Sequence, residues 1–259
     1  MIFESHAHYD DEKFNEDRDF LLQELFGGRI CNIINVGASI ESTKATIALA
    51  EKYEKMYAAA GVHPSEIAGL NEESFSWLKA QLKHPKAAAV GEIGLDYYWE
   101  KDPDIQKKQR YWFARQMKLA QEARIPVIIH SRDAAEDTVR VMKRAHAEEI
   151  PGVIHCYSYS AELAKEFVKM GYYIGVGGVV TFKNAKKLKE TVEQIPLSKI
   201  LIETDAPYMA PEPFRGKRNH SGLLEYVVKK IANLKGVSEE EVEEATEKNA
   251  RDLFGIKDV

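Results

Sequence analysis

The sequence predicts an α/β fold, a single (β/α)8 barrel, and three observations support this prediction. The chain has 259 residues, close to the roughly 250 residues that such barrels commonly have. Eight short apolar runs recur along the chain, with amphipathic stretches between them. Several runs are continuous rather than alternating, as in IINV, PVII and ILI, which is typical of parallel strands buried on both faces. An open doubly wound sheet is the alternative.

The apolar runs are the predicted strands. In chain order they span Ile2–Ser5, Ile30–Val36, Met56–Val62, Ala87–Ile93, Pro126–Ile129, Val153–Ile154, Tyr172–Val176 and Ile200–Ile202. Apolar residues at helical spacing predict helices between strands, most clearly over residues 43–56, 106–123, 136–149, 161–170 and 187–195. A last helix begins after Ser238, which has capping-box spacing with Glu241. No linker interrupts this pattern, so we expect one domain over residues 1–259.

Composition and charge exclude several classes of protein. The chain carries 36 basic and 41 acidic residues, a net charge of -5, which argues against coating nucleic acid by bulk electrostatics but permits local phosphate contacts. Two cysteines, Cys31 and Cys156, are too few for a disulfide framework or a thiolate zinc cluster. No apolar run approaches the roughly 18 residues of a membrane helix, and the first residues do not form a signal peptide. We therefore expect a cytoplasmic protein.

Polar side chains stand at the predicted carboxyl ends of the strands, where barrel enzymes have their active sites. Five of the 8 histidines occur there together with three carboxylates: His6, His8, His63, Glu92, His130, His155, Glu203 and Asp205. A single strand-end histidine is more often a hydrogen-bonded polar residue than a metal ligand. Because a barrel brings all its strand ends to one mouth, the whole set predicts one shared site.

The residue types in this set suit two divalent metal ions. His6 and His8 are two apart on one strand, so both side chains face the same way and can hold one ion. His130 and His155 come from adjacent strands and can hold a second ion, while the two oxygens of Glu92 could bridge the pair. Nitrogen and oxygen ligands without thiolate suit Mg²⁺, Mn²⁺ or Zn²⁺. Two such ions would activate a bridging water and clamp the oxygens of an ester.

Four side chains, three of them in this set, have roles that the sequence specifies less closely. Asp205 could complete the first metal site and accept a proton from the attacking water. Glu203, two residues earlier, should share its face and could orient Asp205 or a water. His63 fits a substrate contact as well as a metal ligand. Arg132, two residues after His130, is the strongest candidate for a contact with phosphate.

Other features have a structural as well as a functional interpretation. The glycine-rich run at 174–180 lacks the GxGxxG pattern, so we expect no dinucleotide site, and a tight turn is the simpler interpretation. The basic residues at 215–218 and the aromatic residues 97–99 could contact nucleic acid, although solvated and packed positions are commoner. Cys156 follows His155 directly. Because neighbours on a strand face opposite sides, we expect Cys156 to pack rather than act as a nucleophile.

Nine motifs together resemble one known family. They are SHAH at 5–8, GVHP at 61–64, GEIGLDYY at 91–98, IHSRDA at 129–134, HCYS at 155–158, GVGGVVTFKNA at 175–185, ETDAPYMAP at 203–211, RGKRN at 215–219 and NARDLF at 249–254. Over nearly its whole length the chain resembles the TatD family of metal-dependent deoxyribonucleases, which are amidohydrolase-like TIM barrels. The resemblance implies metal ligation at His6, His8, Glu92, His130, His155 and Asp205. It makes Glu203 a candidate extra ligand or water-positioning residue, and His63 and Arg132 candidate substrate-phosphate contacts.

The chain departs from the family pattern at three places. Glu4 stands where the family usually has Asp, and Tyr159 stands where glycine commonly follows the HC(F/Y)S motif. His220 and Ser221 stand where the family usually has Glu-Pro after RGKRN. These changes spare the expected ligands and concern substrate shape and loop contacts.

The resulting hypothesis is a nuclease that acts on DNA ends. The resemblance implies 3′ to 5′ exonuclease action on single-stranded DNA with Mg²⁺ or Mn²⁺, and we expect catalytic roles for Asp205, Glu92 and Glu203. The net charge of -5 favours recognition of a terminus over a long duplex. A hydrolase of amides, lactones or carboxyl esters, such as an aminoacyl-tRNA deacylase, is one alternative. A non-catalytic metal-binding scaffold is another, although nothing in a scaffold requires the full ligand set. We expect no membrane partner and infer no obligatory protein partner.

Overall fold

The structure, a computed structural model of the chain, describes residues 1–257, in which eight parallel strands follow one another in chain order. They are β1 (Ile2–Ala7), β2 (Ile30–Val36), β3 (Met56–Ala59), β4 (Ala87–Asp96), β5 (Val127–Arg132), β6 (Gly152–Ile154), β7 (Tyr173–Val176) and β8 (Ile200–Ile202). The barrel closes just past β8, where the N–H of His8 donates to the carbonyl of Ala206 at 2.8 Å and the N–H of Asp205 donates to the carbonyl of His6 at 3.0 Å. The predicted (β/α)8 barrel is confirmed.

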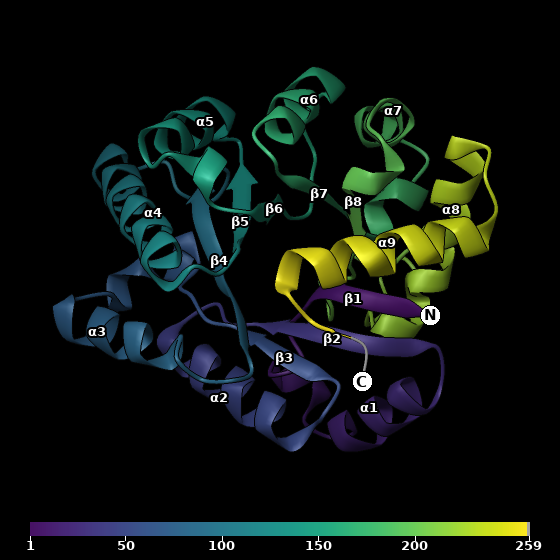
Figure 1. The fold of residues 1–259 in the computed structure, drawn as a ribbon, viewed down its shortest axis with the longest axis horizontal. Coiled ribbons are helices and arrows are strands. Elements are labelled where there is room, and N and C mark those ends of the chain that lie inside the picture. Colours follow the sequence, from purple (N-terminus) through teal and green to yellow (C-terminus); the bar gives the residue numbers. More distant parts are fainter. Residues whose placement is uncertain (258–259) are drawn as a thin grey trace.

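Helices follow the strands and form the outer layer of the molecule (Figure 1). They are α1 (Arg18–Gly27), α2 (Ile40–Lys52), α3 (Glu72–Gln81), α4 (Pro103–Ala123), α5 (Ala135–Arg144), α6 (Ala161–Lys169), α7 (Lys186–Gln194), α8 (Leu224–Lys235) and α9 (Glu239–Phe254). Ser238 caps α9 by accepting a hydrogen bond from the N–H of Glu241 at 3.1 Å, as its position predicts. Within residues 1–257, none of the helices combines the length and hydrophobicity needed to cross a bilayer.

Several strands differ in length from the sequence prediction. β4 continues through Asp96 and β5 through Arg132, three residues beyond the ends of their apolar runs. Hydrophobicity marks only the buried part of a strand, whereas backbone pairing between β4 and β5 continues past it, with Asp96 opposite Arg132. β3 is shorter than expected and ends at Ala59. As a result, the polar residues at the ends of β4 and β5 lie on paired strands rather than on loops.

Apolar packing fills the end of the barrel at which the strands begin. The ring of Phe3 stacks on that of Phe254 in α9 with centroids 6.1 Å apart, so α9 covers this end. Figure 1 shows α9 lying alongside β1, close to the N-terminus of the chain. The cluster also contains Ile34, Ala59, Ala89, Ile128, Val153, Leu201, Ala250 and Leu253. Apolar side chains therefore fill one end of the barrel, which leaves the carboxyl ends of the strands for polar side chains.

Candidate metal centre

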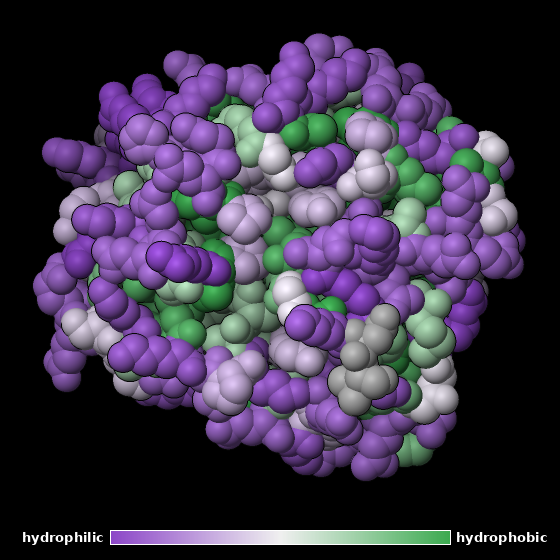
Figure 2. Space-filling view, viewed as in Figure 1, coloured by the Kyte–Doolittle hydropathy of each residue, from purple (hydrophilic) through white to green (hydrophobic). Residues whose placement is uncertain are grey.

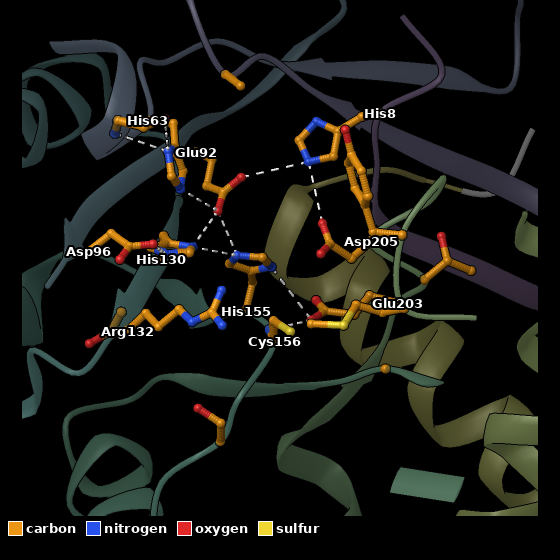
Figure 3. A pocket seen from close by; sticks show the side chains of 18 of the residues that line it. His8, His63, Glu92, Asp96, His130, Arg132, His155, Cys156, Glu203 and Asp205 are labelled. Carbon is orange, nitrogen blue, oxygen red and sulfur yellow. Dashed lines mark hydrogen bonds and ion pairs between the residues drawn. The ribbon is translucent and has the colours of Figure 1, made fainter. Parts of the chain in front are cut away.

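The polar residues singled out in the sequence surround one cavity of about 800 Å³ at the carboxyl ends of the strands (Figure 3). Those lining it are His8, His63, Glu92, His130, Arg132, His155, Glu203 and Asp205. His6 is fully buried beside them, with its ring stacked on that of His155 at a centroid distance of 4.0 Å. The predicted convergence of these side chains therefore occurs.

Glu92 lies between two pairs of histidines. Its Oε1 is 2.8 Å from Nδ1 of His130 and 2.6 Å from Nε2 of His155. Its Oε2 faces the other pair, at 3.5 Å from Nε2 of His6 and 3.7 Å from Nε2 of His8. Asp205 completes the second pair, with Oδ1 3.4 Å from Nε2 of His8. One carboxylate oxygen of Glu92 thus serves each pair, which is the arrangement of a bridging ligand.

Hydrogen bonds fix which ring nitrogen of His8 and His130 faces the centre. Nδ1 of His8 donates to the carbonyl of Val36 at 2.8 Å, which leaves the lone pair of Nε2 directed at Asp205 and Glu92. Nε2 of His130 donates to the carboxylate of Asp96 at 3.1 Å, which leaves Nδ1 directed at Glu92. Both rings therefore present an acceptor nitrogen to the centre, as a metal ligand must.

His63 is oriented in the opposite sense. Its Nδ1 accepts a hydrogen bond from the backbone N–H of Ser65 at 3.1 Å, so the proton of the neutral ring sits on Nε2. Burial, with the neighbouring His130 ring, lowers the pKa of His63 to about 3, so the ring is neutral. Nε2 lies 3.7 Å from Oε1 of Glu92 and points into the cavity as a donor. His63 therefore suits a hydrogen bond to an anionic substrate better than ligation of a metal.

Glu203 lies on the other side of the stacked histidine rings. Its Oε1 accepts the backbone N–H of Cys156 and lies 3.7 Å from Nδ1 of His155. Oε2 of Glu203 and the Nδ1 atoms of His6 and His155 are buried without a hydrogen-bond partner. Because Nε2 of His155 faces the centre, its Nδ1–H group is directed at Glu203. This is the position of a carboxylate that orients a ligand histidine.

The donor set fits divalent cations. Three groups of side chains offer ligand atoms within 4.8 Å of one another: His6, His155 and Glu203; His6, His8 and Asp205; and His63, Glu92 and His130. Nitrogen and carboxylate oxygen donors without thiolate suit Mg²⁺, Mn²⁺ or Zn²⁺.

The charges of the side chains in the centre agree with this fit. Although burial opposes ionisation, the neighbouring histidines hold the pKa of Glu92 well below its ordinary value. Asp205 likewise outweighs burial and raises the pKa of His8 to about 9. In the metal-free protein, protons therefore occupy positions that cations would take.

Sequence reasoning did not single out Asp96 as a site residue. Besides accepting from His130, it lies at the end of β4, where its backbone N–H donates to the buried side chain of Gln109 in α4 at 3.0 Å. The motif GEIGLDYY contains Asp96, but a lone aspartate three residues past an apolar run carries no sign of its partner. Only the pairing of β4 with β5 places it against His130.

Comparison with known proteins identifies the family. The family described as TatD related DNase matches residues 3–255. The "uncharacterized metal-dependent hydrolase YabD" of Bacillus subtilis is 43% identical over 257 residues, covering 99% of this chain and 100% of that protein. The chain belongs to the TatD family. The crystal structure of YjjV, a TatD homolog from Escherichia coli, superposes with a TM-score of 0.92 at 32% identity, covering 99% of this chain and 98% of that one.

This TatD-family chain is a metal-dependent hydrolase, and its barrel architecture extends to more distant structures. An organophosphorus hydrolase variant from Deinococcus radiodurans superposes with a TM-score of 0.60 at 12% identity, covering 98% of this chain and 93% of that one, a likeness of fold alone.

Each departure from the TatD pattern has a defined place in the structure. Glu4 is fully buried, and its carboxylate accepts the N–H and hydroxyl of Thr204, next to Glu203. The hydroxyl of Tyr159 contacts that of Ser131, in β5, at 2.9 Å. The Ser221 hydroxyl lies 2.8 Å from that of Tyr9. Glu4, Tyr159, His220 and Ser221 do not line the cavity themselves, although Thr204 and Ser131, which Glu4 and Tyr159 contact, do.

The prediction that Cys156 and His155 face opposite sides of a strand was wrong. β6 ends at Ile154, and Cys156 has a φ of 46°, so it does not alternate with His155 but lines the same cavity. Burial raises the pKa of the Cys156 thiol to about 12, which keeps it protonated near neutral pH. A thiolate nucleophile is therefore disfavoured, as expected, but by burial rather than by strand alternation.

The remaining candidates have mixed outcomes. Arg218 in the basic 215–218 loop is paired with Asp17 and is not free to meet phosphate. Tyr97 donates its hydroxyl to Asp137 at 2.7 Å and packs, as the simpler interpretation predicts. Trp99, by contrast, is 73% exposed. The guanidinium of Arg132 lies over the ring of Tyr98, 4.0 Å from its centroid, at the edge of the cavity.

Proposed function

We propose that this TatD-family hydrolase is a deoxyribonuclease that removes nucleotides from the 3′ ends of single-stranded DNA with two divalent ions, Mg²⁺ or Mn²⁺. The observation that carries the proposal is the carboxylate of Glu92, which presents one oxygen to each histidine pair. Paired ions are the usual means of hydrolysing phosphodiesters. Apolar side chains fill the opposite end of the barrel, so the cavity does not run through it, which suits a chain end rather than the middle of a strand.

The protein side chains would divide the work between metal binding and substrate binding. The first ion would be held by His6, His8 and Asp205, the second by His130 and His155, and both by Glu92. When bound, such ions stabilise the negative charge that develops on the phosphoryl oxygens. Asp205 would accept a proton from the attacking water, and Glu203 would orient His155 through its Nδ1–H group.

Two side chains would recognise the scissile phosphate. His63 has its Nε2–H directed into the cavity and is neutral, so it can donate to a phosphoryl oxygen. Arg132 supplies a planar pair of donors that matches two phosphate oxygens. Its guanidinium is held over Tyr98, which limits its orientations.

A gel time course tests this function. Metal-stripped protein is incubated with 5′-labelled single-stranded DNA and Mg²⁺, Mn²⁺ or Zn²⁺, with His130→Ala as the inactive control. We expect a metal-dependent ladder that shortens from the 3′ end and is lost in the variant. Intact DNA under every ion would contradict the nuclease proposal and favour a carboxyl-ester or amide substrate.

The Arg132→Ala variant separates these substrate classes. Loss of a charge-assisted contact to a phosphoryl oxygen typically costs about 1.5–3 kcal/mol, so we expect kcat/KM on DNA to fall about 10- to 100-fold. Hydrolysis of a neutral aryl ester should be unchanged, because nothing in that substrate needs the guanidinium. An equal loss on both substrates would count against a phosphate contact and indicate a general disturbance of the cavity.

A further inference from the structure

A second feature that can bind anions lies outside the barrel mouth, between α4 and α5. It is a groove of about 610 Å³, here called the α4–α5 groove, lined by Lys107, Arg110, Tyr111, Ala114, Lys118, Gln121, Arg140, Val141, Arg144, Ala145 and His146. Five of these residues are lysine or arginine, and none is acidic. The whole chain has a net charge of -5, so the charge of this surface is opposite in sign to that of the molecule.

Three of the cationic groups are free to bind an anion. Lys107, Lys118 and Arg144 are exposed and form no ion pair within 4 Å in residues 1–257. Lys118 lies near Glu122, but that carboxylate is already paired with Lys79. Arg110 and Arg140 both contact Asp137, so one carboxylate is shared between two guanidinium groups. Positive charge therefore remains in excess along the groove.

The shape of the groove suits an extended chain. Lys107, Tyr111, Ala114 and Lys118 recur at intervals of three and four residues, so they lie along one face of α4. Small and apolar side chains, including Ala114 and Ala145, also line it. The ring of Tyr111 is 54% exposed, so a base could stack on it. In Figure 2 the surface over α4 and α5 is mostly hydrophilic.

Residue contacts connect the groove to the cavity. Arg110 donates to the hydroxyl of Tyr97 at 2.7 Å, and Tyr97 directly follows Asp96, which lines the cavity. Arg132 and the exposed Trp99 lie at the same edge of the cavity. The groove therefore lies on the side of the barrel formed by β4 and β5, next to this edge of the cavity.

The opposite side of the cavity carries the opposite charge. Asp10 and Asp11 line it beyond β1, which lies across the barrel from β5. Carboxylates there disfavour phosphates, whereas Arg132 and Arg110 attract them on the side of β4 and β5. This asymmetry gives an extended anionic substrate one favoured direction of exit.

We propose that the α4–α5 groove binds the phosphodiester backbone of a single-stranded nucleic acid whose 3′ end occupies the cavity. Lys107, Lys118 and Arg144 contact successive phosphates, and Tyr111 stacks on a base. The inference rests on the proposed function, because it assigns the path of that substrate.

The test measures binding and cleavage separately. A triple variant, Lys107→Gln, Lys118→Gln and Arg144→Gln, is compared with a control that removes the same charge elsewhere: Lys169→Gln, Lys187→Gln and Lys229→Gln, all exposed on α6, α7 and α8. Binding of a fluorescein-labelled single strand of about 20 nucleotides is followed by anisotropy in EDTA at several salt concentrations. Each single-strand phosphate contact contributes about 0.7 to the slope of log Kd against log salt, so we expect the groove variant to lose about 2 from that slope.

Cleavage then tests the path. With metal added, the groove variant should show a raised KM on the long strand and an unchanged kcat/KM on a dinucleotide, which is too short to reach the groove. Equal salt slopes for the groove and control variants would overturn the inference even if the enzyme degrades DNA. If only the groove variant had a reduced salt slope and the enzyme cleaved no DNA, the groove would be a nucleic-acid-binding surface and the nuclease proposal would be wrong. Groove-dependent binding of polyglutamate in place of DNA would assign the surface to an acidic protein and overturn the inference.

Discussion

At the scale of single residues, the orientation of each histidine is decided by the nitrogen that faces away from the centre. The carbonyl of Val36 fixes His8, and the carboxylate of Asp96 fixes His130. The backbone N–H of Ser65 fixes His63 in the opposite sense. Under the proposed function, chemically identical side chains are thereby divided into metal ligands and a substrate donor. The partner atom, rather than the histidine itself, sets this division.

We expect Asp96→Asn to weaken metal binding about 10- to 100-fold, because the ring of His130 loses the carboxylate that holds its ligand nitrogen toward the centre. Affinity for Mn²⁺ can be measured by competition with a fluorescent chelator. Glu66→Gln serves as the control, since it removes one negative charge from the same cavity wall. Within residues 1–257, the carboxylate of Glu66 has a hydrogen bond to the Ser65 hydroxyl alone. Equal losses in both variants would indicate long-range electrostatics rather than orientation of His130.

The sequence predicted the site residues by type and position but not their partners. His6, Glu92 and Asp205 could be predicted because each stands near the end of an apolar run, where a barrel places its site. The contact of Asp96 with His130 and that of Glu203 with His155 depend on strand register and loop geometry. The hydrophobic pattern of the sequence carries no information on strand register or loop geometry, so these two interactions could be identified only from the structure.

At the scale of elements, the pairing of β4 with β5 holds Glu92, Asp96 and His130 in one rigid unit. The two strands approach closely at Gly94, which has a φ of 145°. A Cβ atom there would lie 1.9 Å from the carbonyl oxygen of His130. The apolar pattern predicted both strands but not their last residues, because those residues are polar and pair through the backbone. The glycine requirement likewise follows from this close approach rather than from the pattern.

We expect Gly94→Ala to destabilise the protein by about 3 kcal/mol or more, since the backbone cannot move away without breaking the pairing. For a chain of this size that corresponds to a fall in Tm of roughly 6–12 °C, measurable by thermal denaturation. Gly27→Ala at the end of α1 is the matched control, because nothing lies within 4 Å of its Cβ position. That change should be neutral or slightly stabilising. A fall in Tm of similar size in both variants would contradict the argument from close approach.

At the scale of the whole molecule, the centre couples metal binding to protonation and to stability. Buried carboxylates and histidines from strands on all sides of the barrel meet there, and without cations they are balanced by protons on the histidines. Burial opposes these protons, but Asp205, Asp96 and Glu92 retain them. A cation that replaces the protons ties together elements that are distant in sequence. Stability should therefore depend on metal, and metal binding on pH.

We expect Mn²⁺ to stabilise the metal-stripped protein. At a free Mn²⁺ concentration one hundred times Kd, the free energy of unfolding should rise by about 2.7 kcal/mol, which raises Tm by roughly 5–11 °C. The pKa of His8 is raised to about 9, so below that pH the ring is protonated and a cation must displace the proton. Apparent affinity should therefore rise between about pH 6.5 and 8.5 and fall in acid. His130→Ala should reduce the shift in Tm, whereas His146→Ala on the exposed surface should retain it. A Tm that does not respond to Mn²⁺, Mg²⁺ or Zn²⁺ would rule out a shared metal centre. If the Mn²⁺ concentration that gives half of the shift in Tm were the same at pH 6.5 and pH 8.5, protons would not compete for the ligand nitrogens.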